Sequence, residues 1–373
     1  MAEALPGFVE IPGGSKAPMR SDDGRNIDPQ LGLLLGDAAG QKPLASREDV
    51  ALHSEIFPHV PSRQSTDSPS YYGVPVLKQP VWIWTIAAYF YIGGMSGMSA
   101  TLGAAAQLFG GREMRGLVTK TRWIATVGGA MSSLLLIQDL GRPERFLHML
   151  RVFKISSPMS MGSWILSAFS AAAGGAAVLP VAPRFLPRFA SVFAPMTALC
   201  GVVAGLLGLP LAAYTGVLLV QTAVPIWRNP LWSVFALCSG TAAASSFLEL
   251  LPLNANEARA VELFGFIGKV GELVFAKQLE TEVAKVERVA RPLQDGFTGM
   301  LWQTSKVLVI ASAIVSLAPG HSRKKRILAG ILGTAAGVCV RFAYFYAGKR
   351  SARDPRATFE QQRSTPAHVA GPI

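Results

Sequence analysis

The sequence predicts an all-α integral membrane protein in which about eight transmembrane helices form a compact bundle. Only 16% of its 373 residues are charged, whereas about 25% are charged in an ordinary soluble domain. The mean hydropathy is +0.34, and the apolar residues gather in runs long enough to cross a bilayer, which takes about 20 residues. This composition argues against a soluble enzyme.

The first element is a polar N-terminal extension over residues 1–80. It holds 7 basic and 10 acidic residues and lacks the basic start and apolar core of a secretory signal. Residues 21–70 are expected to be largely irregular, with a short helix near residues 47–56, and to lie as a strap over the membrane domain or a partner. The first apolar run after this extension is expected to act as the insertion signal itself.

Eight predicted spans make up the transmembrane domain, residues 81–347. The first covers residues 81–109, and the others cover residues 123–137, 159–179, 192–220, 231–251, 260–279, 300–318 and 327–347. The span at 260–279 contains three charged residues, so an amphipathic helix at the membrane surface is an alternative there. The span at 123–137 is short and crosses the bilayer only if Arg122 extends its side chain toward the headgroups and the helix continues to Gln138 or Asp139.

Tryptophans and small residues support this layout. All seven tryptophans fall near predicted span ends, as is typical of the aromatic belt at a membrane surface. Small residues crowd the first span (GGMSGMSATLGAAA) and the third (SAFSAAAGGAA), and small faces allow helices to approach closely in lipid.

The basic residues do not decide which way the bundle crosses the membrane. Residues 81–347 hold 23 basic and 11 acidic residues, and this excess is expected in short loops beside lipid headgroups rather than on nucleic acid. The basic residues near the membrane divide 14 to 11 between the two faces, which is too even to set the orientation. The polar tail over residues 348–373 is predicted to be disordered.

The sequence lacks the residue patterns of a bound cofactor. Cys200, Cys238 and Cys339 lie singly in three different spans, so no iron–sulfur or metal site is predicted. None of the five histidines falls inside a span, where a membrane haem needs its axial ligands, and there is no phosphate-binding Gly-Lys-Ser/Thr loop. The protein is expected to hold no metal and no covalently bound cofactor.

The most informative polar stretch, residues 138–150, follows the second span and reads QDLGRPERFLHML. Asp139 stands where the apolar run ends, and the glycine and proline that follow can end one helix and start another. Two interpretations are open. Asp139 faces a protein-lined cavity near the membrane surface, or it caps the next helix while Arg142 and Arg145 hold headgroups or loop carbonyls.

Two further segments place polar groups near span ends. The sequence SSPMSMGSW, residues 156–164, is typical of a capped helix start. In the fourth span, Tyr214 and Gln221 are seven residues apart and share a helix face beyond Pro210. A proline kink flanked by polar groups can line a pocket, although packed transmembrane helices also tolerate such kinks without a function.

Ionisable residues also lie in the later spans, where they are costly and usually face the bundle interior. Lys269 and Glu272 are three residues apart in the sixth span and can neutralise each other. Lys306 lies in the seventh span and Arg341 in the eighth. A proton relay and structural pairs between helices are both open interpretations.

Four segments then stand in a recognisable order. They are YYGVPVLKQPVWIW (71–84), YFYIGGMSG in the first span, DLGRPERFLHMLRVFKISSPMSMGSW (139–164) and AAYTGVLLVQTAVPIW (212–227). This order resembles the NrfD/polysulfide-reductase family of membrane subunits. The spacing of DLGRP and SPMS, followed by YTG in the fourth span, is the most specific part, and the last four spans agree only in number and rough size.

The resemblance implies an eight-helix subunit, built as two four-helix bundles, that binds a quinone or quinol near one membrane face. It implies Asp139 as the proton acceptor or headgroup ligand and Tyr214 as a hydrogen-bond donor to a quinone carbonyl, with Thr215 of the same motif in the pocket. Arg142 would shape the loop or the partner contact. His148 is added because it lies close to Asp139 in the sequence.

The resemblance also implies partners. Such subunits exchange electrons with a separate iron–sulfur subunit of the four-cluster ferredoxin type, commonly joined to a molybdopterin-type subunit or a multihaem cytochrome. Oxidising a quinol releases two electrons and two protons, and a carboxylate in a partly desolvated pocket suits the proton. Nothing in this sequence takes the electrons. We therefore expect a quinone-reactive subunit that is not catalytic alone, docked to its partner over residues 139–158, in the bacterial inner membrane.

Two alternatives come from other functional classes. Broken helices and buried charges also suit a secondary transporter or a proton-translocating bundle. Such a path would run through Lys269, Glu272, Lys306 and Arg341. The DLGRP, SPMS and YTG set argues against the transporter. A passive membrane anchor without a working quinone pocket is the third interpretation, and the Asp139→Asn variant separates it from the quinone subunit.

Overall fold

The computed structural model describes residues 77–140, 144–151, 153–318 and 322–364, together with four very short strands nearer the N-terminus. The strands β1 (Phe8–Glu10) and β2 (Lys16–Pro18) pair antiparallel, as do β3 (Asn26–Ile27) and β4 (Leu34–Leu35). They belong to a compact unit, Met1–Ser70, that is separate from the helical unit, Tyr71–Ile373. The short helix predicted near residues 47–56 lies outside the described residues.

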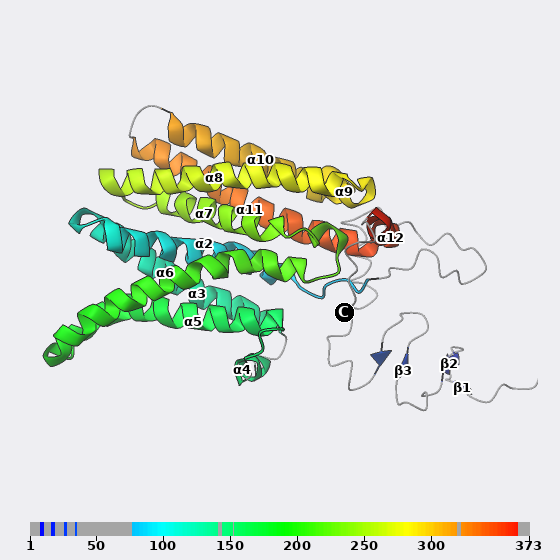
Figure 1. The fold of residues 1–373 in the computed structure, drawn as a ribbon, viewed down its shortest axis with the longest axis horizontal. Helices are drawn as coiled ribbons and strands as arrows, with labels where there is room; N and C mark the ends of the chain where they lie inside the picture. The colour runs from blue at the N-terminus through cyan, green and yellow to red at the C-terminus, as the bar shows by residue number, and fades with distance from the viewer. Residues whose placement is uncertain are drawn as a thin grey trace, which may run out of the picture. The chain divides into compact units, whose positions relative to one another are not determined.

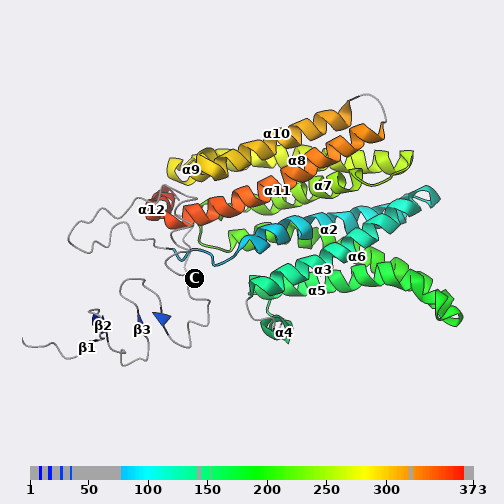
Figure 2. The ribbon, with the colours of Figure 1, turned by 180° about the vertical axis from the view of Figure 1, so that it is seen from behind.

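Eight long helices form the helical unit, one for each predicted span, so the predicted all-α bundle is confirmed (Figure 1). They are α2 (Trp84–Phe109), α3 (Arg115–Asp139), α5 (Pro158–Val178), α6 (Ala190–Val220), α7 (Leu231–Glu249), α8 (Ala255–Ala284), α10 (Gly296–Leu317) and α11 (Arg323–Arg353). Five of these, α5, α6, α7, α10 and α11, are by length and composition able to cross a membrane. The other three, α2, α3 and α8, lie alongside them (Figure 2).

The long helices divide into two four-helix bundles, as the sequence predicted. In the first bundle α2, α3, α5 and α6 contact one another, and in the second α7, α8, α10 and α11 do so. The two bundles meet along a seam where α2 and α6 pack on α7 and α2 packs on α11 (Figure 1).

Successive long helices run in opposite directions, so the connections fall into two groups. One group, which we call the Asp139 end, holds the start of α2, the 140–157 and 221–230 connections, α9 (Glu287–Gln294) and α12 (Pro355–Ser364). The other, the Glu249 end, holds the connections at residues 110–114, 179–189 and 250–254 and the start of α11. A 26-residue helix such as α2 is about 39 Å long, which exceeds the ~30 Å hydrocarbon core of a bilayer.

Small residues allow the closest helix contacts. A methyl group on Gly97 of α2 would lie 2.6 Å from the carbonyl oxygen of Gly208 on α6, and one on Gly216 would lie 2.3 Å from the Cα of Ser233 on α7. Backbones that approach this closely have no room for a side chain. Gly97 belongs to the small-residue stretch of the first span that was predicted to bring helices together, so that prediction is confirmed there; the sequence analysis did not single out Gly216 for such a contact.

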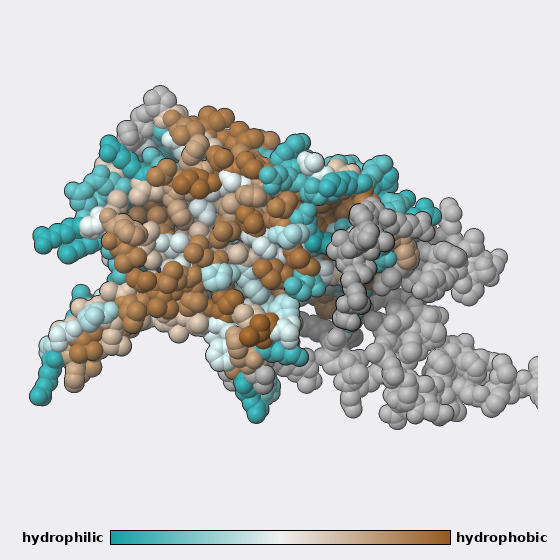
Figure 3. Space-filling model, viewed as in Figure 1, coloured by the Kyte–Doolittle hydropathy of each residue, from teal (hydrophilic) through white to brown (hydrophobic). Residues whose placement is uncertain are grey.

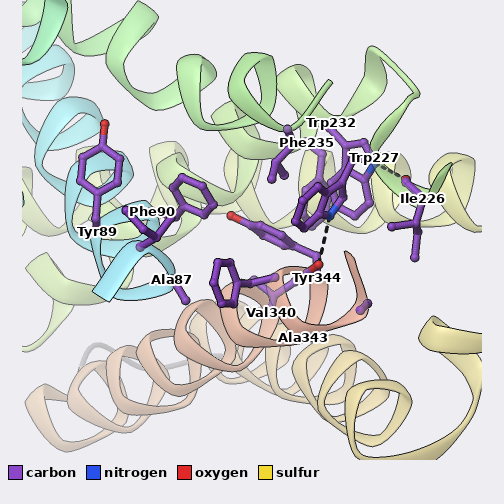
Figure 4. Packing of buried hydrophobic residues seen from close by; sticks show 14 of the residues in the cluster. Ala87, Tyr89, Phe90, Ile226, Trp227, Trp232, Phe235, Val340, Ala343 and Tyr344 are labelled. Carbon is purple, nitrogen blue, oxygen red and sulfur yellow. Dashed lines mark hydrogen bonds between the residues drawn. The ribbon is translucent and has the colours of Figure 1, made fainter. Parts of the chain in front are cut away.

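An aromatic cluster fills the seam toward the Asp139 end (Figure 4). The indole N–H of Trp227 donates to the carbonyl oxygen of Tyr344 at 3.1 Å, and that of Trp232 donates to the carbonyl oxygen of Ile226 at 2.8 Å. The predicted aromatic belt is therefore wrong for Trp227, Trp232 and Trp302, which are at most 1% exposed. Each of these indoles has a hydrogen-bond partner inside the protein, so none needs the membrane surface.

The outer surface of the helical unit is apolar around its middle and hydrophilic near the helix ends (Figure 3). Large apolar side chains that point outward come from both bundles, such as Leu134, Leu199, Leu206, Leu263 and Ile314, all at least 60% exposed. Such a surface suits a lipid environment rather than water.

Three helices depart from their predicted limits or placement. The α3 helix extends over 25 residues, so the span predicted at 123–137 needs no snorkelling Arg122, which instead donates to the side chain of Gln107 at 2.8 Å. The α8 helix packs within the second bundle rather than on the membrane surface. The predicted disordered tail, residues 348–373, is wrong for its first part, because α11 continues to Arg353 and α12 follows; residues 365–373 lie outside the described residues.

Candidate functional site at the Asp139 end

The DLGRP to SPMS segment covers the Asp139 end of the first bundle. Asp139 is the last residue of α3, the short helix α4 (Glu144–Arg151) follows, and α5 begins at Pro158. The hydroxyl of Ser157 accepts the backbone N–H of Ser160 at 3.4 Å, so the predicted cap at the start of α5 is confirmed. Arg142 lies outside the described residues.

Asp139 caps the start of α2. Its Oδ1 accepts the backbone N–H of Ile83 at 3.1 Å and the hydroxyl of Thr85 at 3.5 Å, and both donors belong to the start of α2. A carboxylate at this position satisfies an unpaired N–H and lies at the positive end of the helix dipole. The predicted cap on the next helix stays a prediction, because residues 141–143 lie outside the described residues.

A cation from the second bundle also approaches this carboxylate. Lys349, near the end of α11, is close enough to Asp139 to interact with it electrostatically. Its ammonium group lies 5.2 Å from the centre of the Phe345 ring, a cation–π distance. Asp139 is half-buried and so stands at the seam, in reach of α2, α3 and α11.

Tyr214 connects the YTG and SPMS segments directly. Its hydroxyl donates a hydrogen bond to the carbonyl oxygen of Pro158, and its ring lies against Gly162, where an added methyl group would be 2.3 Å from ring carbons. The residue is 8% exposed. The YTG and SPMS motifs, which both belong to the family resemblance, are therefore in contact, and only a glycine at position 162 leaves room for the tyrosine ring.

One helix brings Asp139 and Tyr214 into a common neighbourhood. Thr85 of α2 binds Asp139, and Tyr89, one turn further along α2, is close enough to Tyr214 for their phenol groups to interact electrostatically. In Figure 4 the Tyr89 side chain points away from the aromatic cluster. The first two turns of α2 thus bind Asp139 and come within electrostatic range of Tyr214, the two residues predicted for the quinone site.

The other predicted pocket residues are placed differently. Thr215 is buried, and its hydroxyl donates to the carbonyl oxygen of Ala212 within its own helix at 3.2 Å. His148 is exposed on α4. Gln221 ends α6 and is exposed, whereas Tyr214 on the same helix is buried. The structure thus places Asp139 and Tyr214 near the same helix, α2. It does not place Thr215 or His148 with them.

The ionisable residues of the later spans form two clusters in the second bundle. Lys269 does not pair with Glu272 as the sequence suggested; its ammonium lies 3.4 Å from Glu249 and 3.1 Å from the hydroxyl of Ser316. Glu272 instead interacts with Arg341 and hydrogen-bonds Ser239. The structural pairs that the sequence left open are thus present, with different partners.

Arg341 stands at the centre of the first cluster. It is fully buried and donates to the hydroxyl of Ser239 on α7 and, at 3.4 Å, to the carbonyl oxygen of Phe90 on α2. Lys306 lies elsewhere, because it binds Glu280, which also accepts the indole N–H of Trp302 at 2.6 Å. Glu280 is eight residues from Glu272 along α8, or about 12 Å. The four predicted path residues therefore divide into a Lys269–Glu272–Arg341 region and a separate Lys306 pair.

Several contributing residues were missed from the sequence. Thr85 directly follows a quoted motif but carries no signal that its partner is 54 residues away. Lys349 fell in the predicted tail, outside every predicted span. For Thr85 and Glu249 the available signal was a polar residue near the end of a predicted span.

The described part of the protein contains no group of three or more His, Cys, Asp or Glu side chains that could hold a metal ion. Cys200, Cys238 and Cys339 are half-buried free thiols on three different helices.

Comparison with known proteins agrees with this arrangement. The family model described as "Polysulphide reductase, NrfD" matches residues 74–351, from just before α2 almost to the end of α11. The sequence is 28% identical over 248 residues to the C subunit of the polysulfide reductase of Wolinella succinogenes, a match that covers 63% of this protein and 75% of that one. The region matched by the family model contains nearly all of the eight long helices and both motifs that meet at Tyr214. The protein is therefore a multi-pass integral membrane protein that belongs to the polysulphide reductase NrfD family.

Proposed function

We propose that this protein is the quinone-reactive membrane subunit of a respiratory oxidoreductase complex in a bacterial inner membrane. It exchanges electrons between a quinone or quinol and a partner iron–sulfur subunit, which is joined to a molybdopterin-type subunit or a multihaem cytochrome. Membership of the NrfD family supports a membrane subunit of an oxidoreductase, and the relative from Wolinella succinogenes is itself part of a reductase.

The single observation that carries the proposal is the position of Asp139. It is a half-buried carboxylate at the end of a long helix, in reach of a lysine from the other bundle and one helical turn from the neighbourhood of Tyr214. A quinol that gives up two electrons must also release two protons. Asp139 is the group we assign to accept a proton, because one of its oxygens is engaged by α2 while its partial exposure allows the proton to leave.

Tyr214 is the second assigned residue. A phenol can donate a hydrogen bond to a quinone carbonyl, and this phenol already donates to the carbonyl oxygen of Pro158. Binding a quinone would exchange one carbonyl acceptor for another, at little net cost in hydrogen bonds. Thr215, Arg142 and His148 remain candidates for shaping the pocket or the partner contact.

A partner subunit is required because the two electrons of the quinol need an acceptor. The protein supplies no sequence pattern for a haem or an iron–sulfur cluster, so we assign the electrons to a cluster in a docked subunit. The docking surface that we propose is the connection over residues 139–158, whose described basic residues include Arg151 and Lys154.

The proposal is tested with the complex purified from its natural membrane. The Asp139→Asn variant is expected to lower quinol-analogue turnover by about 10²-fold or more, in keeping with the usual contribution of a general base. Asp295→Asn is the matched control, because Asp295 is an exposed carboxylate at the same end that precedes α10 and lies outside the proposed site. Unchanged turnover in Asp139→Asn would remove Asp139 from the mechanism, and a complex without an iron–sulfur subunit would overturn the assignment.

A second candidate, a proton-translocating bundle, is favoured by one observation. Lys269, Glu272 and Arg341 are each at most 4% exposed in the middle of the second bundle. Buried ionisable residues at this depth are costly and often functional. Glu272→Gln is expected to lower proton release in vesicles that contain the complex while it oxidises quinol; unchanged turnover and unchanged proton release would remove this candidate.

A further inference from the structure

A polar pocket opens at the end of the helical unit opposite to Asp139. It has a volume of about 400 Å³ and lies in the second bundle between α7, α8, α10 and α11. Its charged lining residues are Glu249, Arg259, Glu262, Lys325 and Arg326. None of the residues assigned to the quinone site contributes to it.

Glu249 forms the inner wall of this pocket. The residue is 1% exposed, and its Oε1 accepts Lys269 Nζ and the hydroxyl of Ser316, each at 3.4 Å. These distances are longer than the 2.7–2.9 Å or so of a strong charge-assisted hydrogen bond. The other oxygen, Oε2, has no hydrogen-bond partner among the described residues.

Glycines on the neighbouring helices make space for this carboxylate. A methyl group on Gly330 of α11 would lie 3.1 Å from the Cβ of Glu249, and one on Gly265 of α8 would lie 3.8 Å from its Oε1. The side chain is therefore closely surrounded on these two sides, and it forms part of the lining of the pocket. An unpaired carboxylate oxygen in such a place is costly unless water reaches it.

The pocket has the room and the polarity for that water. Each water takes about 30 Å³ of liquid volume, so a cavity of this size holds on the order of ten waters. Polar groups from three of the four helices line it beside Glu249, namely Arg259 and Glu262 of α8, Ser316 of α10, and Lys325 and Arg326 of α11.

We propose that this pocket is a water-filled vestibule through which Glu249 exchanges protons with the medium at the Glu249 end. Hydronium in the vestibule gives one proton to Oε2 and leaves a water molecule, and no electron moves. The charges that face Glu249 are Lys269, Arg259 and Glu262 from α8 and Lys325 and Arg326 from α11. The cations of α8 and α11 balance the two carboxylates, so the vestibule has no net negative charge that would bind a metal ion. The exchange is therefore a proton transfer.

Protonation at this site has a consequence deeper in the bundle. A neutral Glu249 no longer balances the charge of Lys269, whose remaining carboxylate neighbour is Glu272, three residues along α8. The vestibule is therefore linked to the Arg341 cluster at the seam. None of these steps uses Asp139 or a quinone. An experiment that disproves the proposed function would therefore leave the vestibule proposal unaffected, and the reverse also holds.

The test labels the carboxyl group from one side of the membrane. The full-length protein is reconstituted in vesicles, and a water-soluble carbodiimide, which adds to a protonated carboxyl group to form a stable acylurea, is supplied outside. Labelled peptides are identified by mass spectrometry. Two variants report which end of the protein faces outward. An impermeant maleimide labels Arg112→Cys when the Glu249 end faces outward and Arg228→Cys when the Asp139 end does. The native cysteines are replaced by alanine in both variants.

Glu257 is the matched control within the same molecule. It is 2% exposed at the same end, but its Oε2 accepts Lys120 Nζ at 2.8 Å and the backbone N–H of Asn254 at 3.0 Å. We expect Glu249 to be labelled about tenfold more than Glu257, only from the Glu249 end, and more strongly as the pH falls, since the protonated fraction of a carboxyl changes about tenfold per pH unit above its pKa. Equal labelling of the two residues, or labelling of Glu249 from the Asp139 end, would overturn the proposal.

A second measurement does not depend on carboxyl chemistry. Ala329→Cys places a thiol on the pocket wall, and Ala336→Cys places one seven residues deeper on the same face of α11; both native residues are at most 1% exposed, but only Ala329 lines the pocket. An impermeant thiol reagent supplied at the Glu249 end is expected to modify the first at least about tenfold faster, because water reaches only the vestibule. Equal protection of both thiols would show a dry pocket and overturn the inference.

Discussion

At the scale of single residues, Asp139 combines two roles that different substitutions separate. Its carboxylate completes the first turn of α2, and in the proposed mechanism it also accepts a proton. An asparagine keeps an oxygen acceptor for the Ile83 N–H and loses the titratable group, whereas an alanine loses both.

Thermal unfolding in detergent therefore distinguishes the two roles. Asp139→Ala is expected to destabilise the protein by about 0.5–2 kcal/mol, the usual cost of losing a helix cap, and Asp139→Asn by clearly less. Quinol turnover is expected to fall in both. If the two variants lost turnover only in proportion to their lost stability, the proton role of Asp139 would be wrong.

The contact between Tyr214 and Gly162 gives a second prediction. Tyr214→Phe removes one hydrogen bond to Pro158 and is expected to cost about 1 kcal/mol. Gly162→Ala is expected to cost more, about 1–3 kcal/mol, because the added methyl group meets the ring at 2.3 Å. Both costs are measured as shifts in the unfolding midpoint. Adding Tyr214→Ala to Gly162→Ala is expected to recover part of the loss, and strictly additive costs would show that the two residues do not clash.

The residues of the site could be predicted only in part. The sequence identified Asp139 and Tyr214 because each belongs to a short motif. It did not identify Thr85, Lys349 or Glu249, since the partner of each is brought close by helix packing rather than by spacing. The pairing of Lys269 with Glu249, instead of with Glu272 on its own helix, has the same cause.

At the scale of helices, the crossing of α2 and α6 depends on two glycines. Gly97→Ala is expected to destabilise the bundle by about 1–3 kcal/mol, because its methyl group would meet the backbone of Gly208 at 2.6 Å. Gly174→Ala on α5 is the matched control, since nothing lies within 4 Å of its added methyl group. The control is expected to be neutral or to gain up to about 1 kcal/mol from helix propensity. Equal destabilisation of both variants in a thermal unfolding assay would contradict the close crossing.

Helix limits were the least predictable part of the elements. Hydropathy marks only the stretch that lies in the hydrocarbon, whereas α3 and α11 continue for several polar residues beyond it. In α11 these residues are held by tertiary contacts, such as the donation from Arg353 to the side chain of Gln79 at 2.8 Å. A tail predicted from polarity alone could not reveal those contacts.

At the scale of the whole molecule, Arg341 ties the two bundles together. It contacts α2 and α7 from α11 and faces Glu272 of α8. Arg341→Met is expected to cost about 3–5 kcal/mol because it leaves the carboxylate of Glu272 buried without its cation.

A double-mutant cycle checks this assignment. Adding Glu272→Gln to Arg341→Met is expected to recover a large part of the lost stability, because the uncompensated charge is removed. Strictly additive costs in the unfolding of the purified protein would mean that the two side chains do not interact.

The eight long helices and their order followed from the sequence, and the division into two bundles followed from the family resemblance. The placement of the tryptophans did not, because the same residue type suits a membrane surface and a buried seam with carbonyl partners. The orientation of the bundle in the membrane could not be predicted either, since the basic residues divide almost evenly between the two faces.

The cap on α2 also bears on how the protein is built into the membrane. The first turn of α2 is completed by a side chain that stands 54 residues later, at the far end of α3. Because α2 precedes α3 in the sequence, its first turn stays uncapped until α3 has been synthesised. We therefore expect α2 to reach its full stability only as a hairpin with α3.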